Sequence, residues 1–178
     1  RDGAVVTYPT VETVQRNHIC HIVRAPTPGA TEVAQRAAAI ARRAVEAIDG
    51  VGVFGVELFE MADGAILYNE IAPRPHNTGH YSIEGCVTSQ FENAGRAARG
   101  WPRGSSARVA PAAVMVNTLG LRDAPAEARG MAQALAIPGA HVHVYGKLIS
   151  RVGRKMGHVT ARGASVAEAE AIARAAAD

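Results

Sequence analysis

Aromatic residues are scarce in this sequence, and their scarcity limits both the core and the ligands. They make up 4% of the 178 residues, so the core is expected to consist mainly of Ala, Val, Ile and Leu. The net charge is +3, but no aromatic rings are interleaved with the basic residues for the stacking of nucleic-acid bases. No nucleic-acid partner is therefore expected.

Cysteines are few, and long apolar segments are lacking. Cys20 and Cys86 lie far apart without CxxC spacing, which excludes a disulfide scaffold or a zinc ribbon and predicts two ordinary reduced thiols. No apolar run approaches the roughly 20 residues that span a bilayer. The opening RDGAVVTYPT lacks the charged, apolar and small-residue order of a signal peptide. The sequence therefore predicts no membrane partner and a cytoplasmic location.

The pattern of apolar residues predicts a mixed fold of the α+β class. Periodicity, capping residues and Ala content predict helices over residues 31–48, 89–99 and 125–136 and from residue 165 onward. Alternation of apolar and polar residues predicts strands over residues 1–24, 51–59, 65–71, 109–118, 141–149 and 155–161. Gly, Pro and Ser dominate residues 100–106, as is typical of a linker. We therefore predict two domains, residues 1–103 and 104–178.

Two carboxylates lie on neighbouring strands of the central predicted hairpin, whose turn is Asp63-Gly64. Glu57 belongs to the first strand and Glu70 to the second. Mg²⁺ prefers oxygen ligands and is usually held by one or two carboxylates together with substrate phosphates. From the residues alone, the pair is either a metal site or two solvated acids on a hairpin.

A basic, polar loop follows the second strand directly. Arg74 can bind a carboxylate, bicarbonate or phosphate through its two-pronged guanidinium, and His76 and Asn77 supply directed hydrogen bonds. The other interpretation is an exposed polar loop without a ligand. Because the loop can bind an anionic substrate beside the two carboxylates, it favours the metal-site interpretation of that pair.

Two further groups of charged residues, and several histidines, remain. A short basic segment contains Lys147, Arg151, Arg154 and Lys155. It suits a phosphate monoester, but equally a solvated sheet edge that blocks strand pairing. The arginines of the helix over 31–48, at 36, 42 and 43, are interpreted as a solvated face. No role is assigned to the strand or loop histidines His18, His21, His141, His143 and His158.

The hairpin and its loop closely resemble the N5-carboxyaminoimidazole ribonucleotide synthetases, a group of ATP-grasp enzymes also called the ATPase subunit of phosphoribosylaminoimidazole carboxylase. The central matching segments are GVELF at 55–59 and NEIAPRPHNTGH at 69–80. Flanking matches are YPTVET at 8–13, CVTSQFE at 86–92, YGK at 145–147 and RKMGH at 154–158. The resemblance implies the carboxy-terminal half of an ATP-grasp domain, followed by a small β-rich terminal domain with a helix.

The resemblance also implies a reaction of de novo purine biosynthesis. ATP phosphorylates bicarbonate to carboxyphosphate, which carboxylates 5-aminoimidazole ribonucleotide to give N5-carboxyaminoimidazole ribonucleotide, ADP and phosphate. ATP is then the co-substrate and Mg²⁺ the metal cofactor. A homodimer is compatible with the resemblance.

By motif position, the resemblance assigns three groups of residues. Those expected at the ATP phosphates are Asn69, Glu57 and Glu70, with both carboxylates as Mg²⁺ ligands. Those expected to be catalytic, facing bicarbonate, carboxyphosphate and the aminoimidazole, are Arg74, His76 and Asn77. Those expected to bind the ribonucleotide phosphate are Lys147, Arg154 and Lys155.

The sequence departs from the family pattern in three ways. Many ATP-grasp enzymes have a metal-binding Asn where this chain has Ala72, so only two protein carboxylates are expected at the metal. The ATP-gripping lysines should precede Arg1, and we expect the chain alone to be catalytically silent. The spacing around Arg151 is one residue longer than usual.

Two rival functions differ from the implied one. The nearer is a ligase that resembles the formate-dependent glycinamide ribonucleotide transformylase, which has a related Glu…Glu-x-x-Pro-Arg-x-His pattern. The other is a non-catalytic basic module that binds nucleic acid or a partner chain. The ribonucleotide that triggers ATP hydrolysis distinguishes the first rival from the implied ligase. Binding that weakens with salt but ignores Glu57→Gln and Glu70→Gln would favour the second rival.

Overall fold

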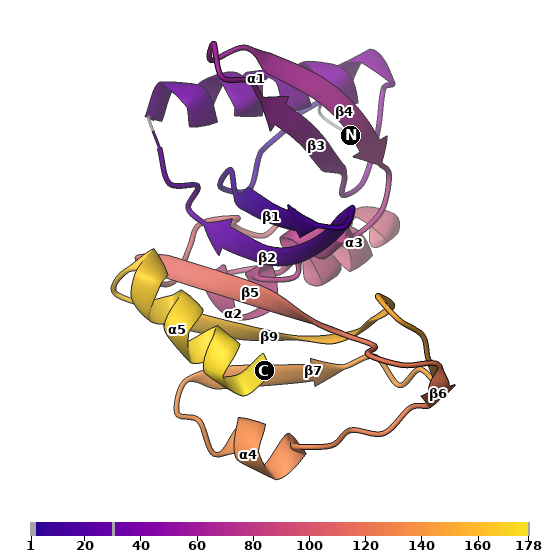
Figure 1. Cartoon of the computed structure of the whole chain (residues 1–178). Helices are drawn as coiled ribbons and strands as arrows, with labels where there is room; N and C mark the ends of the chain where they lie inside the picture. The colour runs from indigo at the N-terminus through magenta and orange to yellow at the C-terminus, as the bar shows by residue number, and fades with distance from the viewer. Residues whose placement is uncertain (1–2, 30, 178) are drawn as a thin grey trace. The chain divides into compact units, whose positions relative to one another are not determined.

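The structure is a computed structural model that describes residues 3–29 and 31–177 (Figure 1). Its contacts divide the chain into two compact units, each described by itself below. The first unit contains Arg1–Val11 and Pro26–Val109, and the second contains Glu12–Ala25 and Ala110–Asp178. Helices and strands are mixed throughout, which confirms the α+β prediction. None of the helices in the described part of the chain is long and apolar enough to cross a bilayer.

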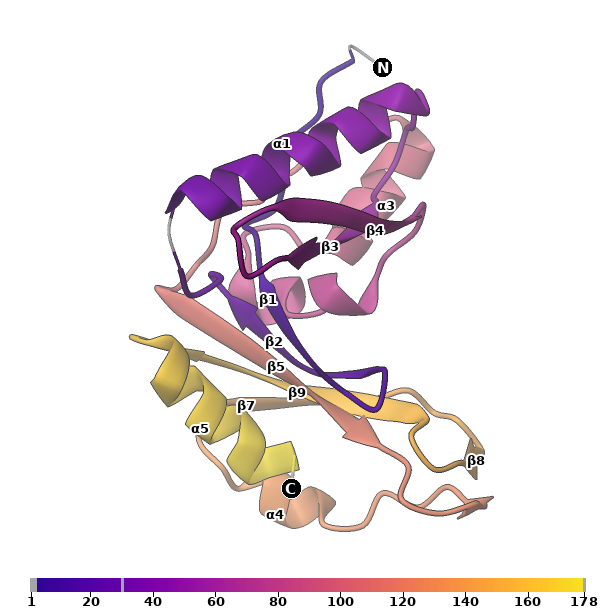
Figure 2. The ribbon, with the colours of Figure 1, turned by 45° about the horizontal axis from the view of Figure 1, so that its top comes forward.

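The first unit is built around an antiparallel hairpin and the helices beside it. Strand β3 (Gly55–Glu60) pairs with β4 (Ile66–Ala72), and α1 (Thr31–Ala47) packs against β4 (Figure 2). After β4 come a 3₁₀ turn, η1 (Asn77–Gly79), and the helices α2 (Ser82–Gly85) and α3 (Gln90–Arg99). The helix over 31–48 and the second strand of the hairpin follow the prediction closely, whereas the first strand begins at Gly55 and not at residue 51. The sequence did not predict η1 and α2.

Helix α1 has the predicted division into two faces. Ala37 and Val45 are buried. The three arginines are exposed, which confirms that they form a solvated face. Asp49 ends the helix with a left-handed φ of 48°, and Gly50 N–H donates to the Val45 carbonyl at 3.2 Å.

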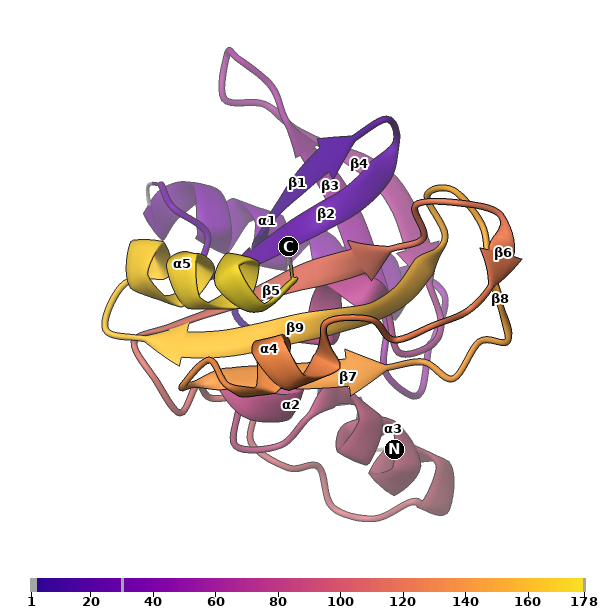
Figure 3. The same cartoon turned by 60° about the horizontal axis from the view of Figure 1, so that its bottom comes forward.

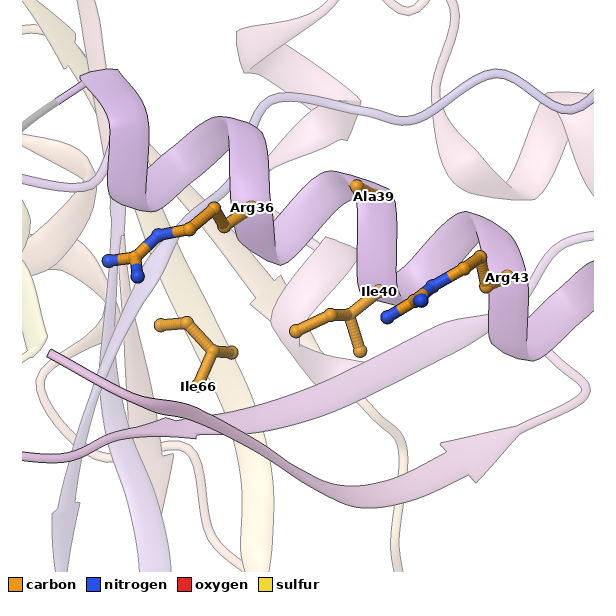
Figure 4. A pocket seen from close by; sticks show the side chains of 5 residues that line it. All are labelled: Arg36, Ala39, Ile40, Arg43 and Ile66. Atoms are coloured by element: carbon orange, nitrogen blue, oxygen red, sulfur yellow. The ribbon is translucent and has the colours of Figure 1, made fainter.

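A shallow pocket of about 310 Å³ lies between α1 and β4. Its lining residues, shown in Figure 4, are Arg36, Ala39, Ile40, Arg43 and Ile66. The two guanidinium groups extend on either side of an apolar floor formed by Ile40 and Ile66 (Figure 4). None of the predicted site residues lines it, so it is separate from the candidate site.

The run of Gly, Pro and Ser after α3 is fastened to the first unit. Ser89 caps α3 by accepting a hydrogen bond from Glu92 N–H at 3.1 Å, and Gly100 ends the helix with a φ of 68°. Gly104 N–H then donates to the Asn93 side chain at 2.9 Å. Val87 N–H donates to the carbonyl of residue 107 at 2.9 Å. The segment is therefore held against α3 at Asn93 and, just beyond its end, against Val87, which precedes α3.

The second unit is built around an antiparallel sheet that is covered mainly by helix α5 (Val166–Ala177) (Figures 1 and 3). Its strands, in spatial order, are β1 (Glu12–Arg16), β2 (Ile19–Ala25), β5 (Ala112–Leu119), β9 (Lys155–Gly163) and β7 (Ala140–Val144). Helix α5 packs on β5 and β9. Small and β-branched residues fill the core, namely Ile22, Val114, Val116, Val159, Ala161, Ala169 and Ala173. Ala, Val and Ile thus form this core as the composition predicts, whereas in the first unit an aromatic residue, Tyr81, is fully buried.

Several predicted boundaries were wrong. Residues 3–11 form no strand, and the hairpin begins only at Glu12, with a turn at Asn17 and His18, whose φ angles are 50° and 60°. The predicted helix over 125–136 is reduced to α4 (Met131–Leu135), because Gly130 at its N-cap has a φ of 74°. Upstream of it, β6 (Ala124–Pro125) pairs instead with β8 (Ile149–Ser150). The predicted strand over 141–149 is correspondingly split, with Gly146 at a φ of 65° between β7 and β8.

An arginine with two carboxylate partners joins β1, β2 and α5. Arg24 contacts Glu12 at 2.7 Å and Glu170 at 2.6 and 3.1 Å, and Arg174 adds a bond to Glu170 at 2.8 Å. The hydrogen bonds from Arg24 lower the pKa of Glu170 to about 2, although partial burial opposes the shift. This network fastens the helix to the sheet edge.

The Glu170→Gln variant is expected to lower the free energy of unfolding by about 1–3 kcal/mol near neutral pH. Because the folded pKa of Glu170 is below its ordinary 4.5, the contribution is complete above that value and is lost as the pH falls toward 2. Urea unfolding at about pH 6 and about pH 3 should therefore show a smaller pH effect in the variant than in the parent. Glu127→Gln, which removes an exposed ion pair with Arg129, is the control. An unchanged pH effect in Glu170→Gln would contradict this prediction.

Candidate functional site

The two predicted metal-binding carboxylates are direct partners across the hairpin. Glu57 on β3 pairs with Glu70 on β4, and a register irregularity lies between Glu57 and Leu58. Opposed residues in an antiparallel pair have Cβ atoms about 4.5–5.5 Å apart, where two like charges destabilise the sheet. Such a pair is stabilised when a cation lies between the side chains. The bulge turns the strand locally and re-aims side chains, as bulges do beside functional sites.

A histidine from the basic loop completes this cluster. His76 Nε2 lies 3.8 Å from one oxygen of Glu57 and 3.8 Å from one oxygen of Glu70. One potential ligand atom from each of the three residues lies within 4.8 Å of the others. Asn69 Nδ2 donates to the second Glu57 oxygen at 3.5 Å. The predicted Asn69, Glu57, Glu70 and His76 are thus brought together.

The donor set fits Mg²⁺ through its two carboxylates. The Glu57 side chain is 23% exposed and that of Glu70 57% exposed, so oxygens remain accessible for an ion that also keeps waters and phosphate ligands. The His76 nitrogen is a poorer ligand for so hard a cation. Glu57 and Glu70 would therefore hold the metal, with His76 beside it.

The basic loop turns sharply after β4, and hydrogen bonds within the loop fix the backbone that carries its polar side chains. Arg74 N–H donates to the Ala72 carbonyl at 2.9 Å, and the Arg74 side chain is exposed. His76 has an extended backbone, with φ −118° and ψ 151°, and η1 begins at the next residue, Asn77. His76 Nδ1 lies 3.0 Å from Thr78 Oγ1, which orients the ring. Arg74 and Asn77 therefore lie on the same short loop as the ring that faces the carboxylates.

The loop crosses β3 closely because residue 55 lacks a side chain. A Cβ built on Gly55 would lie 2.4 Å from the His76 Cβ, a distance that real atoms do not tolerate. Glycine is thus required here for the close approach of two chain segments. This close approach places the His76 ring beside the carboxylate of Glu57, which lies two residues after Gly55 on the same strand.

Sequence reasoning missed the residue that binds the other side of this loop. The carboxamide of Gln90, at the start of α3, hydrogen-bonds to both the N–H and the carbonyl of His76. Gln90 lies inside the matching segment at 86–92, but no local pattern indicates its contact with a loop so far upstream. Only the fold reveals this role.

The predicted phosphate-binding residues gather in the second unit. Lys147 follows β7, Arg154 precedes β9, and Lys155 begins β9. Lys147 Nζ donates to the Lys155 carbonyl, and Arg154 donates to the carbonyl of residue 149 at 2.8 Å. Within residues 3–29 and 31–177, none of the three forms an ion pair with a carboxylate. Partial burial lowers the pKa of Lys147, and the charges of Arg154 and Lys155 lower it further.

Residues without a predicted role support this cationic cluster. Lys147 Nζ lies 5.5 Å from the centre of the Tyr145 ring. The Tyr145 hydroxyl is 2.9 Å from His158 Nδ1, and the buried His158 ring stacks on His143 at 4.3 Å. Two histidines to which the sequence analysis gave no role therefore brace the strand ends from which Lys147 and Lys155 project. The first unit carries the carboxylates and the basic loop, and the second carries the cationic cluster.

The hairpin with its carboxylate pair and the fold around it define a known class of proteins. Residues 1–91 match the family model of the ATP-grasp domain, and the chain belongs to the ATP-grasp family. More narrowly, residues 113–172 match the model of the phosphoribosylaminoimidazole carboxylase C-terminal domain. Both matches confirm the family that the sequence motifs suggested.

Named relatives agree with this assignment. The phosphoribosylaminoimidazole carboxylase of Schizosaccharomyces pombe is 49% identical over 164 residues, which cover 89% of this chain and 30% of the relative. The N5-carboxyaminoimidazole ribonucleotide synthase of Synechococcus elongatus is 49% identical over 163 residues, covering 90% and 40%. This chain therefore spans between 30% and 40% of the length of these two relatives.

A solved structure shows the same fold. It is the N5-carboxyaminoimidazole synthase of Aspergillus clavatus in complex with ADP and 5-aminoimidazole ribonucleotide. The two structures superimpose with a TM-score of 0.84 and 43% sequence identity, and the match covers 93% of this chain and 45% of the other.

The Gly55→Ala variant is expected to displace the basic loop and to destabilise the protein by about 1–3 kcal/mol, as overpacking does. Thermal unfolding and the NMR signals of the His76 ring measure the two effects. The control is Gly95→Ala on α3, where an added Cβ meets nothing within 4 Å. That change should stabilise the helix by about 0.5–1 kcal/mol. Equal stability of the two variants, with an unshifted His76 ring, would show that the close approach is unimportant.

Proposed function

We propose that this chain is part of an ATP-dependent ligase of de novo purine biosynthesis. The enzyme carboxylates 5-aminoimidazole ribonucleotide with bicarbonate by way of carboxyphosphate, and releases N5-carboxyaminoimidazole ribonucleotide, ADP and phosphate. The observation that carries the proposal is the cross-strand pair of Glu57 and Glu70, directly beside a basic loop, in a chain of the ATP-grasp family. The carboxylates that would hold Mg²⁺ and the ATP phosphates thus lie next to the basic loop that would hold bicarbonate, the acceptor of the phosphoryl group.

The carboxylate pair supplies the negative side of the site. Mg²⁺, when bound, would offset the charge on the ATP phosphates. Glu57 is held on a strand and receives a hydrogen bond from Asn69, which fixes one of its oxygens and leaves the other toward His76. Glu70 is the more exposed partner. Ala72, buried on the same strand, provides no third ligand, so Glu57 and Glu70 are the carboxylates that this hairpin offers the metal.

The basic loop supplies the positive side. Phosphoryl transfer is mainly positioning and charge stabilisation, so a bound bicarbonate needs cations and hydrogen-bond donors and little else. The exposed Arg74 guanidinium binds the bicarbonate and the carboxyphosphate that forms from it. His76 and Asn77, on the same turn, donate hydrogen bonds that orient these anions and the aminoimidazole amine.

The cationic cluster of the second unit binds the ribonucleotide phosphate. Lys147, Arg154 and Lys155 crowd together and form no ion pair with a carboxylate among the residues that the structure describes, and their mutual repulsion is relieved by an anion. A phosphate monoester matches this charge. The Aspergillus clavatus relative, which contains 5-aminoimidazole ribonucleotide, supports this choice of substrate over the glycinamide ribonucleotide used by the rival ligase.

The remaining parts of the assignment are proposals of the same kind. We take residues 1–103 as the carboxy-terminal part of the ATP-grasp domain and residues 104–178 as the terminal domain. A homodimer, a cytoplasmic location and the use of bicarbonate stay predictions.

In the intact enzyme that carries these residues, ADP release is expected to require both 5-aminoimidazole ribonucleotide and bicarbonate. Glu57→Gln and Glu70→Gln should each lower kcat by about 100-fold or more, because each removes charge that holds the metal–phosphate complex. Glu60→Gln, at the exposed end of the same strand, is the control. ADP release triggered by glycinamide ribonucleotide and formate would favour the rival ligase. Salt-sensitive binding that ignores both substitutions would favour the basic module.

Arg154→Met and Lys155→Met are expected to raise KM for 5-aminoimidazole ribonucleotide by about 10- to 100-fold each, the worth of one charge-assisted hydrogen bond. KM for ATP should change little, since the lost contact is with the other substrate. Initial-rate kinetics measure both. Arg129→Met is the control, because that arginine is exposed and paired with Glu127. Unchanged KM values for the ribonucleotide in both variants would remove the cluster from the substrate site.

A further inference from the structure

Gln90 is a buried amide whose polar atoms are all directed at the basic loop. Its side chain is at the first position of α3, and the residue is 3% exposed. Oε1 accepts a hydrogen bond from His76 N–H at 2.9 Å, and Nε2 donates to the His76 carbonyl at 2.8 Å. Nε2 also lies 2.7 Å from His80 Nδ1. The carboxamide thus pairs with the loop backbone as a neighbouring strand would.

The contact is shaped by the absence of a side chain at residue 79. A Cβ on Gly79 would lie 2.4 Å from Gln90 Oε1, so any larger residue there would displace the amide from the loop. On the opposite side, His76 rests against Gly55 of β3. His76 is therefore held between a strand and a side chain, with both of its backbone polar groups engaged.

A second set of hydrogen bonds holds Gln90 itself in place. Its backbone N–H donates to Ser82 Oγ at 2.9 Å, and Ser82 Oγ donates to the Gly79 carbonyl at 2.5 Å. Ser82 is fully buried. Loop, α2 and the start of α3 therefore form one hydrogen-bonded assembly around the amide.

We propose that Gln90 is a positioning residue that sets where the His76 ring stands relative to the Glu57–Glu70 pair. Fixing the N–H and the carbonyl of His76 fixes the direction of its Cα–Cβ bond, and hence the place of the ring 3.8 Å from both carboxylates. The catalytic consequence rests on the proposed function. Arg74 and Asn77, on the same short loop, share this anchoring.

Other side chains at this position preserve only part of the arrangement. Glutamate keeps an acceptor for His76 N–H and places a second oxygen where Nε2 faces the His76 carbonyl and His80 Nδ1. When that oxygen carries a proton it donates to the carbonyl as the amide does, and when ionised it accepts from His80 Nδ1 but repels the carbonyl. Methionine has nearly the same length and no polar atom that replaces the amide. It removes the acceptor for His76 N–H and leaves the His76 carbonyl with the hydrogen bond from Gly79 N–H at 2.9 Å, a costly loss for backbone groups shielded from water. The two variants therefore remove different numbers of hydrogen bonds to the loop while the side-chain volume stays almost constant.

The test combines hydrogen exchange of the chain with kinetics of the intact enzyme, in the Gln90→Met and Gln90→Glu variants. In Gln90→Met, amide exchange over residues 76–80 should rise about tenfold or more while β5 and β9 keep their protection. Its kcat should fall about 10- to 100-fold, as for a small misplacement of catalytic groups, with KM for ATP changed less than about twofold. Gln90→Glu should recover part of both losses. Gln35→Met, the same substitution at an exposed position of α1, should change neither.

Each other outcome has a definite meaning. Unchanged exchange over residues 76–80 in Gln90→Met would overturn the proposal, as would faster exchange with unaltered kinetics. If Gln90→Met loosens the whole first unit, the glutamate variant decides, because a fall in kcat without general loosening requires a positioning role. If the unaltered enzyme shows no ADP release dependent on 5-aminoimidazole ribonucleotide, the proposed function fails, and the exchange measurement still tests whether Gln90 holds the loop.

Discussion

The placement of two like charges opposite each other on a short hairpin is the constraint on which the first unit depends. Glu57 and Glu70 repel each other across β3 and β4, and a two-stranded sheet has little stability to offset such repulsion. Helix α1 on one side and the loop after β4 therefore have to hold the hairpin. The His76 imidazole, 3.8 Å from both carboxylates, and the Asn69 amide, which donates to Glu57 at 3.5 Å, both reduce this repulsion.

The support for this arrangement comes from residues without charge. Gly55 allows the loop to cross the strand, and Gln90 binds the loop backbone from the other side. In the second unit, Tyr145 and His158 brace the cationic cluster in a comparable way, through a ring and a buried imidazole. In each unit a buried side chain, Gln90 in the first and His158 in the second, anchors the charged residues, which are partly or fully exposed. The charges thus stay available to ligands while the buried contacts fix their positions.

The sequence predicted the features that depend on local patterns. The helix over 31–48, the central hairpin and the Ser89 cap follow from periodicity, a turn dipeptide and a capping residue, and all are present. The helix predicted over 125–136 was too long because the Ala content of this stretch favours a helix. Gly130 and the pairing of β6 with β8 restrict the helix to the short α4. The carboxylates and the basic loop were found from their motif. Gln90 was not, because its importance arises from a contact between segments that no periodicity links.

The division of the chain between the two units has a consequence for how it folds. The hairpin of β1 and β2 precedes almost all of the first unit, yet β2 pairs with β5, joining Ala25 to Ala113. During synthesis this hairpin emerges early and must await its neighbouring strand, while the first unit assembles in the intervening loop. Such non-local pairing slows folding and leaves an unpaired strand edge exposed meanwhile. A cut in the run at 100–106 would therefore not release two self-sufficient pieces, because the strands of one sheet would end up on both.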